Sequence, residues 1–138
     1  TRRKLKPDNP LPPMEFVTED GFTVLCGRNN RQNDQLTLKT ARNYDLWFHT
    51  KDIPGSHVIL QSQGEDRPIP ERSILQAATI AATHSRGQDS NQVPVDYTLI
   101  KYVKKPNGAR PGMVIFTHNK TLYVAPNPAL CEKLAKDS

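Results

Sequence analysis

Residues 68–85, which read PIPERSILQAATIAATHS, form the clearest helical pattern in the sequence. The apolar residues recur at a spacing of three and four, which gathers them on one side of a helix: Ile74, Ala77, Ala78, Ala81 and Ala82. Pro70 suits the first turn of such a helix, and Gly87 suits its end. Because alanine side chains are small, this helix can lie close against a β-sheet, which the rest of the chain must then supply.

Short β-type segments occur on both sides of this helix. They span residues 14–28, 44–52, 57–63, 93–105 and 113–126. The first and the last are predicted hairpins, with turns at Glu19-Asp20-Gly21 and His118-Asn119-Lys120. A short helix is predicted from a cap at Asn33 or Asp34 to about Ala41, and a final helical turn or two in residues 128–138. The sequence therefore predicts an α+β fold: an antiparallel or mixed β-sheet with hairpins and one main helix packed on it.

The charge is concentrated in two places. The chain carries a net charge of +5. Its basic clusters contain no acidic residue: Arg2, Arg3, Lys4 and Lys6 in the first, and Lys101, Lys104, Lys105 and Arg110 in the second. Either cluster alone could be a solvated loop or tail, but concentrated positive charge also suits a phosphate backbone. The proline-rich residues 1–13, TRRKLKPDNPLPP, are predicted to be a basic linker leading into one domain at residues 14–138.

The segment DLWFHTKDIPGSHVIL, residues 45–60, places aromatic, imidazole and ammonium groups around a Pro54-Gly55 corner. Since side chains alternate along a strand, Trp47, His49 and Lys51 are expected on one face. Together with the amide-rich GRNNR at residues 27–31 and the basic loop near residue 105, this predicts a surface that binds a polyanion. The candidate RNA-binding residues are Arg28, Asn29, Asn30, Arg31, Trp47, His49, Lys51, His57, Lys104, Lys105 and Arg110. The alternatives are a core position for Trp47 and a general protein-interaction surface.

Other classes of site lack their motifs. His49 and His57 could converge as a catalytic pair on RNA, but neither a nucleophile motif nor a zinc motif accompanies them. The glycines form neither a P-loop nor a dinucleotide fingerprint. Cys26 and Cys131 are expected to be reduced packing residues. No apolar run approaches the roughly 20 residues of a membrane helix. We therefore expect no enzyme activity, no catalytic residue, no cofactor, no metal and no membrane partner.

Three segments of the chain, in this order, are similar to one known family: GRNNRQND (27–34), DLWFHTKDIPGSHV (45–58) and QVPVDYTLIKYVKKPNGARPGMVIFTHNKTLYVAP (92–126). They resemble the NFACT-R domain, the C-terminal RNA-binding module of the NFACT family. The resemblance implies a cytoplasmic, ribosome-associated role in quality control. Family members bind large ribosomal subunits that carry an obstructed peptidyl-tRNA, and they recruit charged tRNA to add C-terminal tails without mRNA.

The resemblance also implies partners for this chain. These would be tRNA, large-subunit ribosomal RNA, and the remainder of the full-length protein, namely an NFACT-N domain and a coiled coil. Residues 1–13 resemble the exit from that coiled coil. An older family label, fibronectin-binding protein A-like, keeps open the alternative of a fibronectin-binding surface adhesin module.

Overall fold

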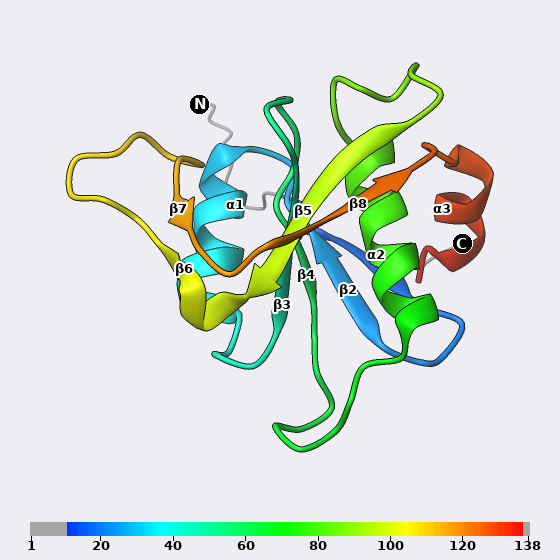
Figure 1. Cartoon of the computed structure of the whole chain (residues 1–138), viewed down its shortest axis with the longest axis horizontal. Helices are drawn as coiled ribbons and strands as arrows, with labels where there is room; N and C mark the ends of the chain where they lie inside the picture. The colour runs from blue at the N-terminus through cyan, green and yellow to red at the C-terminus, as the bar shows by residue number, and fades with distance from the viewer. Residues whose placement is uncertain (1–10, 137–138) are drawn as a thin grey trace, which may run out of the picture.

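A six-stranded antiparallel sheet runs through the domain in the order β1-β2-β4-β3-β5-β8 (Figure 1). Its strands are β1 (Met14–Val17), β2 (Thr23–Cys26), β3 (Leu46–Thr50), β4 (Val58–Leu60), β5 (Val93–Leu99) and β8 (Lys120–Val124). The computed structural model describes residues 11–136. The predicted α+β class is confirmed, and the sheet is antiparallel rather than mixed.

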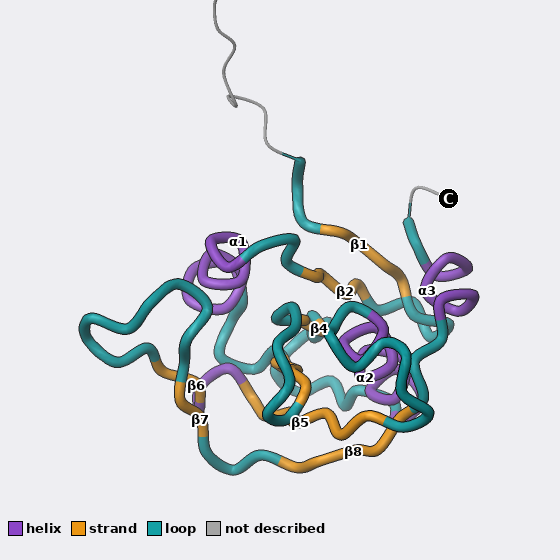
Figure 2. The backbone as a smooth tube through the Cα atoms, turned by 90° about the horizontal axis from the view of Figure 1, so that it is seen from above, coloured by secondary structure: helices purple, strands orange, loops and turns teal. Residues whose placement is uncertain are grey.

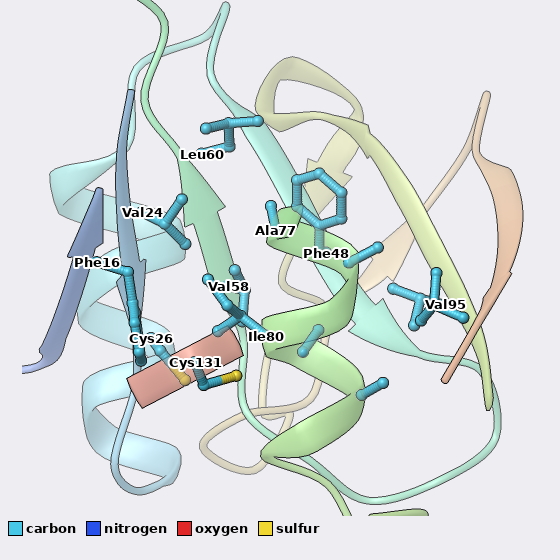
Figure 3. Packing of buried hydrophobic residues seen from close by; sticks show 14 of the residues in the cluster. Phe16, Val24, Cys26, Phe48, Val58, Leu60, Ala77, Ile80, Val95 and Cys131 are labelled. Atoms are coloured by element: carbon cyan, nitrogen blue, oxygen red, sulfur yellow. The ribbon is translucent and has the colours of Figure 1, made fainter. Parts of the chain in front are cut away.

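The main helix, α2 (Glu71–Thr83), packs across one face of the sheet. Its alanines and Ile80 are fully buried against Phe48 of β3 and Val58 of β4 (Figure 3). The last helix, α3 (Pro128–Leu134), contributes Cys131 to the same cluster. Burial of this apolar surface, at roughly 25 cal/mol per Å², is the main force that holds the helix on the sheet.

The opposite face of the sheet is covered by a second helical segment. It begins as α1 (Asn30–Gln35) and continues as a π-helix, η1 (Leu36–Thr40). Leu36 of this segment packs with Trp47, Ile59 and Phe116 in a second apolar cluster. Seen from above, α1 and α2 lie on opposite sides of the strands (Figure 2). Coverage of both faces matches the continuous apolar sequences of β4 and of the first three residues of β3, which are followed by His49 and Thr50.

The structure corrects three details of the sequence prediction. Residues 113–126 do not form a hairpin, because β7 (Ile115–Phe116) pairs with β6 (Val103–Lys104) while β8 pairs with β5. The predicted strand 93–105 is interrupted by a 3₁₀ turn, η2 (Ile100–Tyr102). The cap of α1 is Asn29, whose side chain accepts a hydrogen bond from the Gln32 amide, and not Asn33 or Asp34. The strand differences arise from tertiary pairing, which local turn signals do not encode, whereas the cap at Asn29 is a local choice among neighbouring Asn and Asp residues.

The two ends of the described chain meet beside β1. The Lys136 amide donates a hydrogen bond to the Glu15 carbonyl at 3.0 Å, and Ala135 forms a bridge with Phe16. Cys26 and Cys131 are free and buried, and burial raises the pKa of the Cys26 thiol to about 12. Within residues 11–136 no helix is long and apolar enough to span a bilayer. The N-terminal basic cluster and most of the predicted linker 1–13 lie outside the described residues.

Candidate nucleic-acid interface

Three surface hollows meet at Asn30, the first residue of α1. We name each after one lining residue: the Arg86 hollow, the Arg110 hollow and the Trp47 hollow, with volumes of about 430, 600 and 660 Å³. Asn30 lines all three, so they form one continuous surface, which we call the Asn30 face. The face is built from the β2–α1 loop, the β3–β4 loop, the end of α2 and the loop after β6.

The Arg110 hollow brings two arginines together from distant parts of the chain. Arg31 comes from α1, and Arg110 comes from the loop between β6 and β7; both are exposed. The remaining lining residues are Asn29, Asn30, Pro111 and Met113. No carboxylate lines this hollow, so its potential is positive and suits a phosphate group.

The Arg86 hollow joins the start of α1 to the end of α2. It is lined by Arg28 and Arg86 together with amide and hydroxyl side chains. Two backbone hydrogen bonds hold the end of α2 beside the Pro54-Gly55 corner. The Arg86 amide donates to the Pro54 carbonyl at 2.9 Å, and the Ser56 amide donates to the His84 carbonyl at 3.3 Å. Sequence reasoning missed Arg86 as a site residue, because only this pairing with the Pro54-Gly55 corner brings it to the face.

The Trp47 hollow lies over the second apolar cluster. Its lining includes Trp47, His49 and Phe116, with Lys51 and Asp52 from the β3–β4 loop. His49 and Trp47 stack with an interplanar angle of 7° and centroids 5.9 Å apart. This hollow therefore combines aromatic walls with a few polar groups, a composition typical of sites that hold a small organic group.

The basic loop that carries Arg110 is fastened to α1 by Asp34. One Asp34 oxygen accepts a hydrogen bond from the Gly112 amide at 2.9 Å, and the other forms an ion pair with Lys105 at 3.2 Å. The Lys105 ammonium also donates to the Arg110 carbonyl at 2.6 Å. The charge of Lys105 is thus used to hold the loop. Lys105 lines none of the three hollows, and its contact with RNA stays a prediction.

His57 fastens the same loop from the other side. Its Nε2 lies 3.0 Å from the Gly112 carbonyl oxygen, which can only accept, so Nε2 carries the proton. Nδ1 then accepts from the Thr37 hydroxyl at 2.7 Å. Burial, reinforced by the neighbouring His49, lowers the pKa of His57 to about 4. Burial also lowers the pKa of His49. Both imidazoles are therefore neutral at pH 7 and add no charge to the face.

We expect Gly112→Ala to displace the basic loop. Gly112 has a φ of +86°, and an added Cβ would lie 2.6 Å from Asn30 Oδ1. Gly108→Ala is the matched control, since its φ is +79° but nothing lies within 4 Å of an added Cβ. Both variants carry the left-handed backbone penalty of roughly 1–2 kcal/mol. The clash with Asn30 should lower the free energy of unfolding of Gly112→Ala by roughly 1 kcal/mol more than that of Gly108→Ala. Unfolding in urea measures the difference. Equal losses for the two variants would contradict this account of the loop.

The structure sorts the remaining sequence candidates by exposure. Trp47 and His57 both line the Trp47 hollow, but each is only 1% exposed, so neither projects from the surface. Trp47 packs against Leu36 of η1 and Phe116, and His57 is held between Thr37 of η1 and Gly112. Lys104 is exposed but lines none of the three hollows. The structure places the following on the Asn30 face: Arg28, Asn29, Asn30, Arg31, Trp47, His49, Lys51, His57 and Arg110. Their contact with RNA stays a prediction.

His49 and His57 are close, with ring centroids 5.5 Å apart. Both ring nitrogens of His57 are already engaged within the fold, which leaves it no free nitrogen for a metal or a substrate. Among the residues that the structure describes, no three His, Cys, Asp or Glu side chains are grouped to hold a metal ion.

Comparisons with known proteins identify the family of this chain. The family model described as NFACT protein RNA binding domain matches residues 13–118. The Rqc2 homolog RqcH of Bacillus subtilis is 48% identical over 136 residues, which cover 98% of this chain and 23% of that protein. Ribosome quality control complex subunit 2 of Schizosaccharomyces pombe is 33% identical over 79 residues, 56% of this chain and 8% of that protein.

Among solved structures, the chain is similar to the C-terminal of the fibronectin/fibrinogen-binding protein from Streptococcus suis. The TM-score is 0.88 at 38% identity, covering 97% of this chain and 53% of that one. The chain spans about a quarter of the length of the curated relative from Bacillus subtilis. The predicted resemblance is confirmed: this chain belongs to the family of NFACT protein RNA binding domains.

Proposed function

We propose that this chain is the RNA-contacting module of a ribosome quality control factor, and that it binds RNA through the Asn30 face. The observation that carries the proposal is the convergence of Arg28, Arg31, Arg86 and Arg110 on one continuous surface. None of these four arginines forms an ion pair with a carboxylate in residues 11–136. Arg28 donates one hydrogen bond, from Nε to the Pro12 carbonyl at 2.7 Å, but that contact does not neutralise its charge. The four positive charges can therefore attract phosphates, and each phosphate neutralised releases counterions.

A charge-reversal triple variant tests the proposal. We expect Arg28→Glu/Arg31→Glu/Arg110→Glu to weaken binding of the chain to single-stranded RNA by roughly 100-fold near 100 mM salt, and to reduce the slope of log K against log salt by about 3. The control is Lys39→Glu/Arg67→Glu/Lys101→Glu, which reverses three exposed cations that line none of the three hollows. Both variants change the net charge equally. If both lose affinity to the same extent, net charge is the cause and the Asn30 face is not the binding surface.

The finer part of the proposal concerns the partner. We propose that the RNA is tRNA or ribosomal RNA on an obstructed large subunit in the cytoplasm, and that the domain supports mRNA-independent C-terminal tailing by the full-length protein. The names of the relatives from Bacillus subtilis and Schizosaccharomyces pombe support this assignment. The NFACT-N domain and coiled coil of the longer protein would supply the remaining contacts. Cosedimentation of the chain with purified large subunits, with and without peptidyl-tRNA, tests it; equal recovery with small subunits would count against it.

The proposed role is binding without catalysis. Incubation of the chain with end-labelled RNA, with and without added divalent metal, should leave the RNA unchanged. Cleaved or modified RNA, lost in a His49→Ala variant, would instead support the catalytic alternative.

A fibronectin-binding role is the second candidate, favoured by the description of the similar solved structure from Streptococcus suis. It predicts saturable binding of the chain to immobilised fibronectin that persists at high salt. Binding that disappears as salt rises would be explained by the net charge of +5 alone.

A further inference from the structure

The wall of the Trp47 hollow includes a residue whose hydrogen-bond donor nothing in the described fold uses. Trp47 is 1% exposed, and its indole N–H is the one buried side-chain polar group in residues 11–136 that has no hydrogen-bond partner. Leaving such a donor unpaired costs roughly 1–3 kcal/mol. Trp47 is part of the wall of the hollow, so its indole N–H is a sensitive reporter of any ligand that occupies the hollow.

The walls of the hollow suit a flat, neutral group. Phe116 lies 4.7 Å from Trp47 between ring centroids, and Met113, which is 51% exposed, forms part of the rim. On the polar side, Asp96 Oδ1 accepts hydrogen bonds from Asn119 at 3.2 Å and from Thr121 at 2.6 Å. A carboxylate has about four acceptor positions, so Asp96 can still accept from an amino group on a ligand.

Charge separates this hollow from its neighbour. The Trp47 hollow is lined by one cation, Lys51, and two carboxylates, Asp52 and Asp96, so an anionic group is not favoured inside it. The Arg110 hollow is lined by two arginines and no carboxylate. The two hollows share a rim formed by Asn30, Pro111 and Met113. A nucleotide has the matching division, with a neutral aromatic base joined to an anionic phosphate.

We infer that the Trp47 hollow receives the base of one unpaired nucleotide, while the attached phosphate lies in the Arg110 hollow. This inference rests on the proposed function and assigns to the Asn30 face a binding site for a single base. Apolar contact of the base with the wall, above all with Phe116 and Met113, would then add to the salt-dependent phosphate contacts.

The single tryptophan makes the test direct. In a ¹⁵N-labelled sample the indole N–H gives one cross peak. We expect a short single-stranded RNA to shift that peak, and an oligomer of the same length with abasic riboses to leave it in place. The RNA with bases should also bind at least about fivefold more tightly than the abasic oligomer at equal salt.

Two exposed apolar residues on one segment provide matched variants. Met113→Ala should remove most of the preference for RNA with bases, whereas Ile115→Ala, at a residue that is 59% exposed and lines none of the three hollows, should keep it. If both oligomers bind equally well and the indole peak does not move, the inferred base-binding site is wrong, while the proposed RNA binding is retained. If neither oligomer binds at low salt, the proposed function itself fails.

Discussion

Gly27→Ala is expected to lower the free energy of unfolding by about 3 kcal/mol. Gly27 is buried, and an added Cβ would lie 2.0 Å from Asn33 Oδ1 and 3.1 Å from the Asn33 amide nitrogen. The cost is steric, because the φ of Gly27 lies outside the left-handed region. Urea unfolding at neutral pH measures this loss of stability, which should appear as a lower midpoint with an unchanged slope m.

The cost is large because Asn33 has no room to move. It is 3% exposed, and its Oδ1 accepts the His57 amide at 3.0 Å. Moving that oxygen leaves the buried His57 N–H without a partner, which costs roughly 1–3 kcal/mol, and the strain of overpacking costs a similar amount.

A double-mutant cycle separates the clash from other effects. Asn33→Ala alone removes the acceptor of the His57 amide, but it also removes the side-chain atoms that a methyl group added at Gly27 would meet. The combined variant Gly27→Ala/Asn33→Ala should therefore be at least about 1 kcal/mol more stable than the sum of the two single losses predicts. Additive losses would show that the clash with Asn33 is not the cause.

The pH dependence of stability is the second large effect. His57 is neutral in the fold and has a pKa lowered to about 4, against an ordinary value near 6.5. Below pH 6.5 the unfolded chain binds a proton that the folded chain excludes, so stability is complete above pH 6.5 and falls as the pH drops toward 4. From about pH 7.5 to about pH 5 we expect a loss of about 2 kcal/mol in the free energy of unfolding. The lowered pKa of His49 acts in the same direction.

Two variants identify the source of this dependence. His57→Gln cannot titrate but keeps an N–H that can reach the Gly112 carbonyl, so its stability should vary less over the same pH range. His118→Gln, at an exposed residue, should follow the unchanged chain. The carboxyl pKa values of Glu19 and Asp20 are lowered, mainly by hydrogen bonds from Lys133 and Arg72, so their stabilising effect is lost at more acidic pH. A profile for His57→Gln as steep as that of the unchanged chain would contradict this assignment.

Local patterns in the sequence predicted the parts of the fold that depend on local signals. Helical periodicity predicted α2, and the Glu19-Asp20-Gly21 turn predicted the pairing of β1 with β2. The false hairpin at residues 113–126 has the same local signals. Its two strands instead pair with β5 and β6, partners that lie earlier in the chain. Turn residues indicate where a chain bends, but the partner of each strand depends on the whole sheet.

The candidate site, like the fold, was predictable from the sequence only where it depends on local signals. The charged residues Arg28, Arg31 and Arg110 could be identified from composition. The role of Lys105 could not, because a paired lysine and a free one look alike in a sequence, and Asp34 is 71 residues away. The burial of Trp47 was also hidden. Alternation along β3 gives its face correctly, but only the arrival of η1 and of Phe116 determines that this face is covered.

The hydrogen bond between residues 15 and 136 has a consequence for how such a domain is carried in a longer protein. Entry into the fold and exit from it lie next to each other, so the domain can be inserted into a loop of a host protein without forcing the two cut ends apart. The architecture of the domain therefore does not require it to be the last module of the protein that contains it.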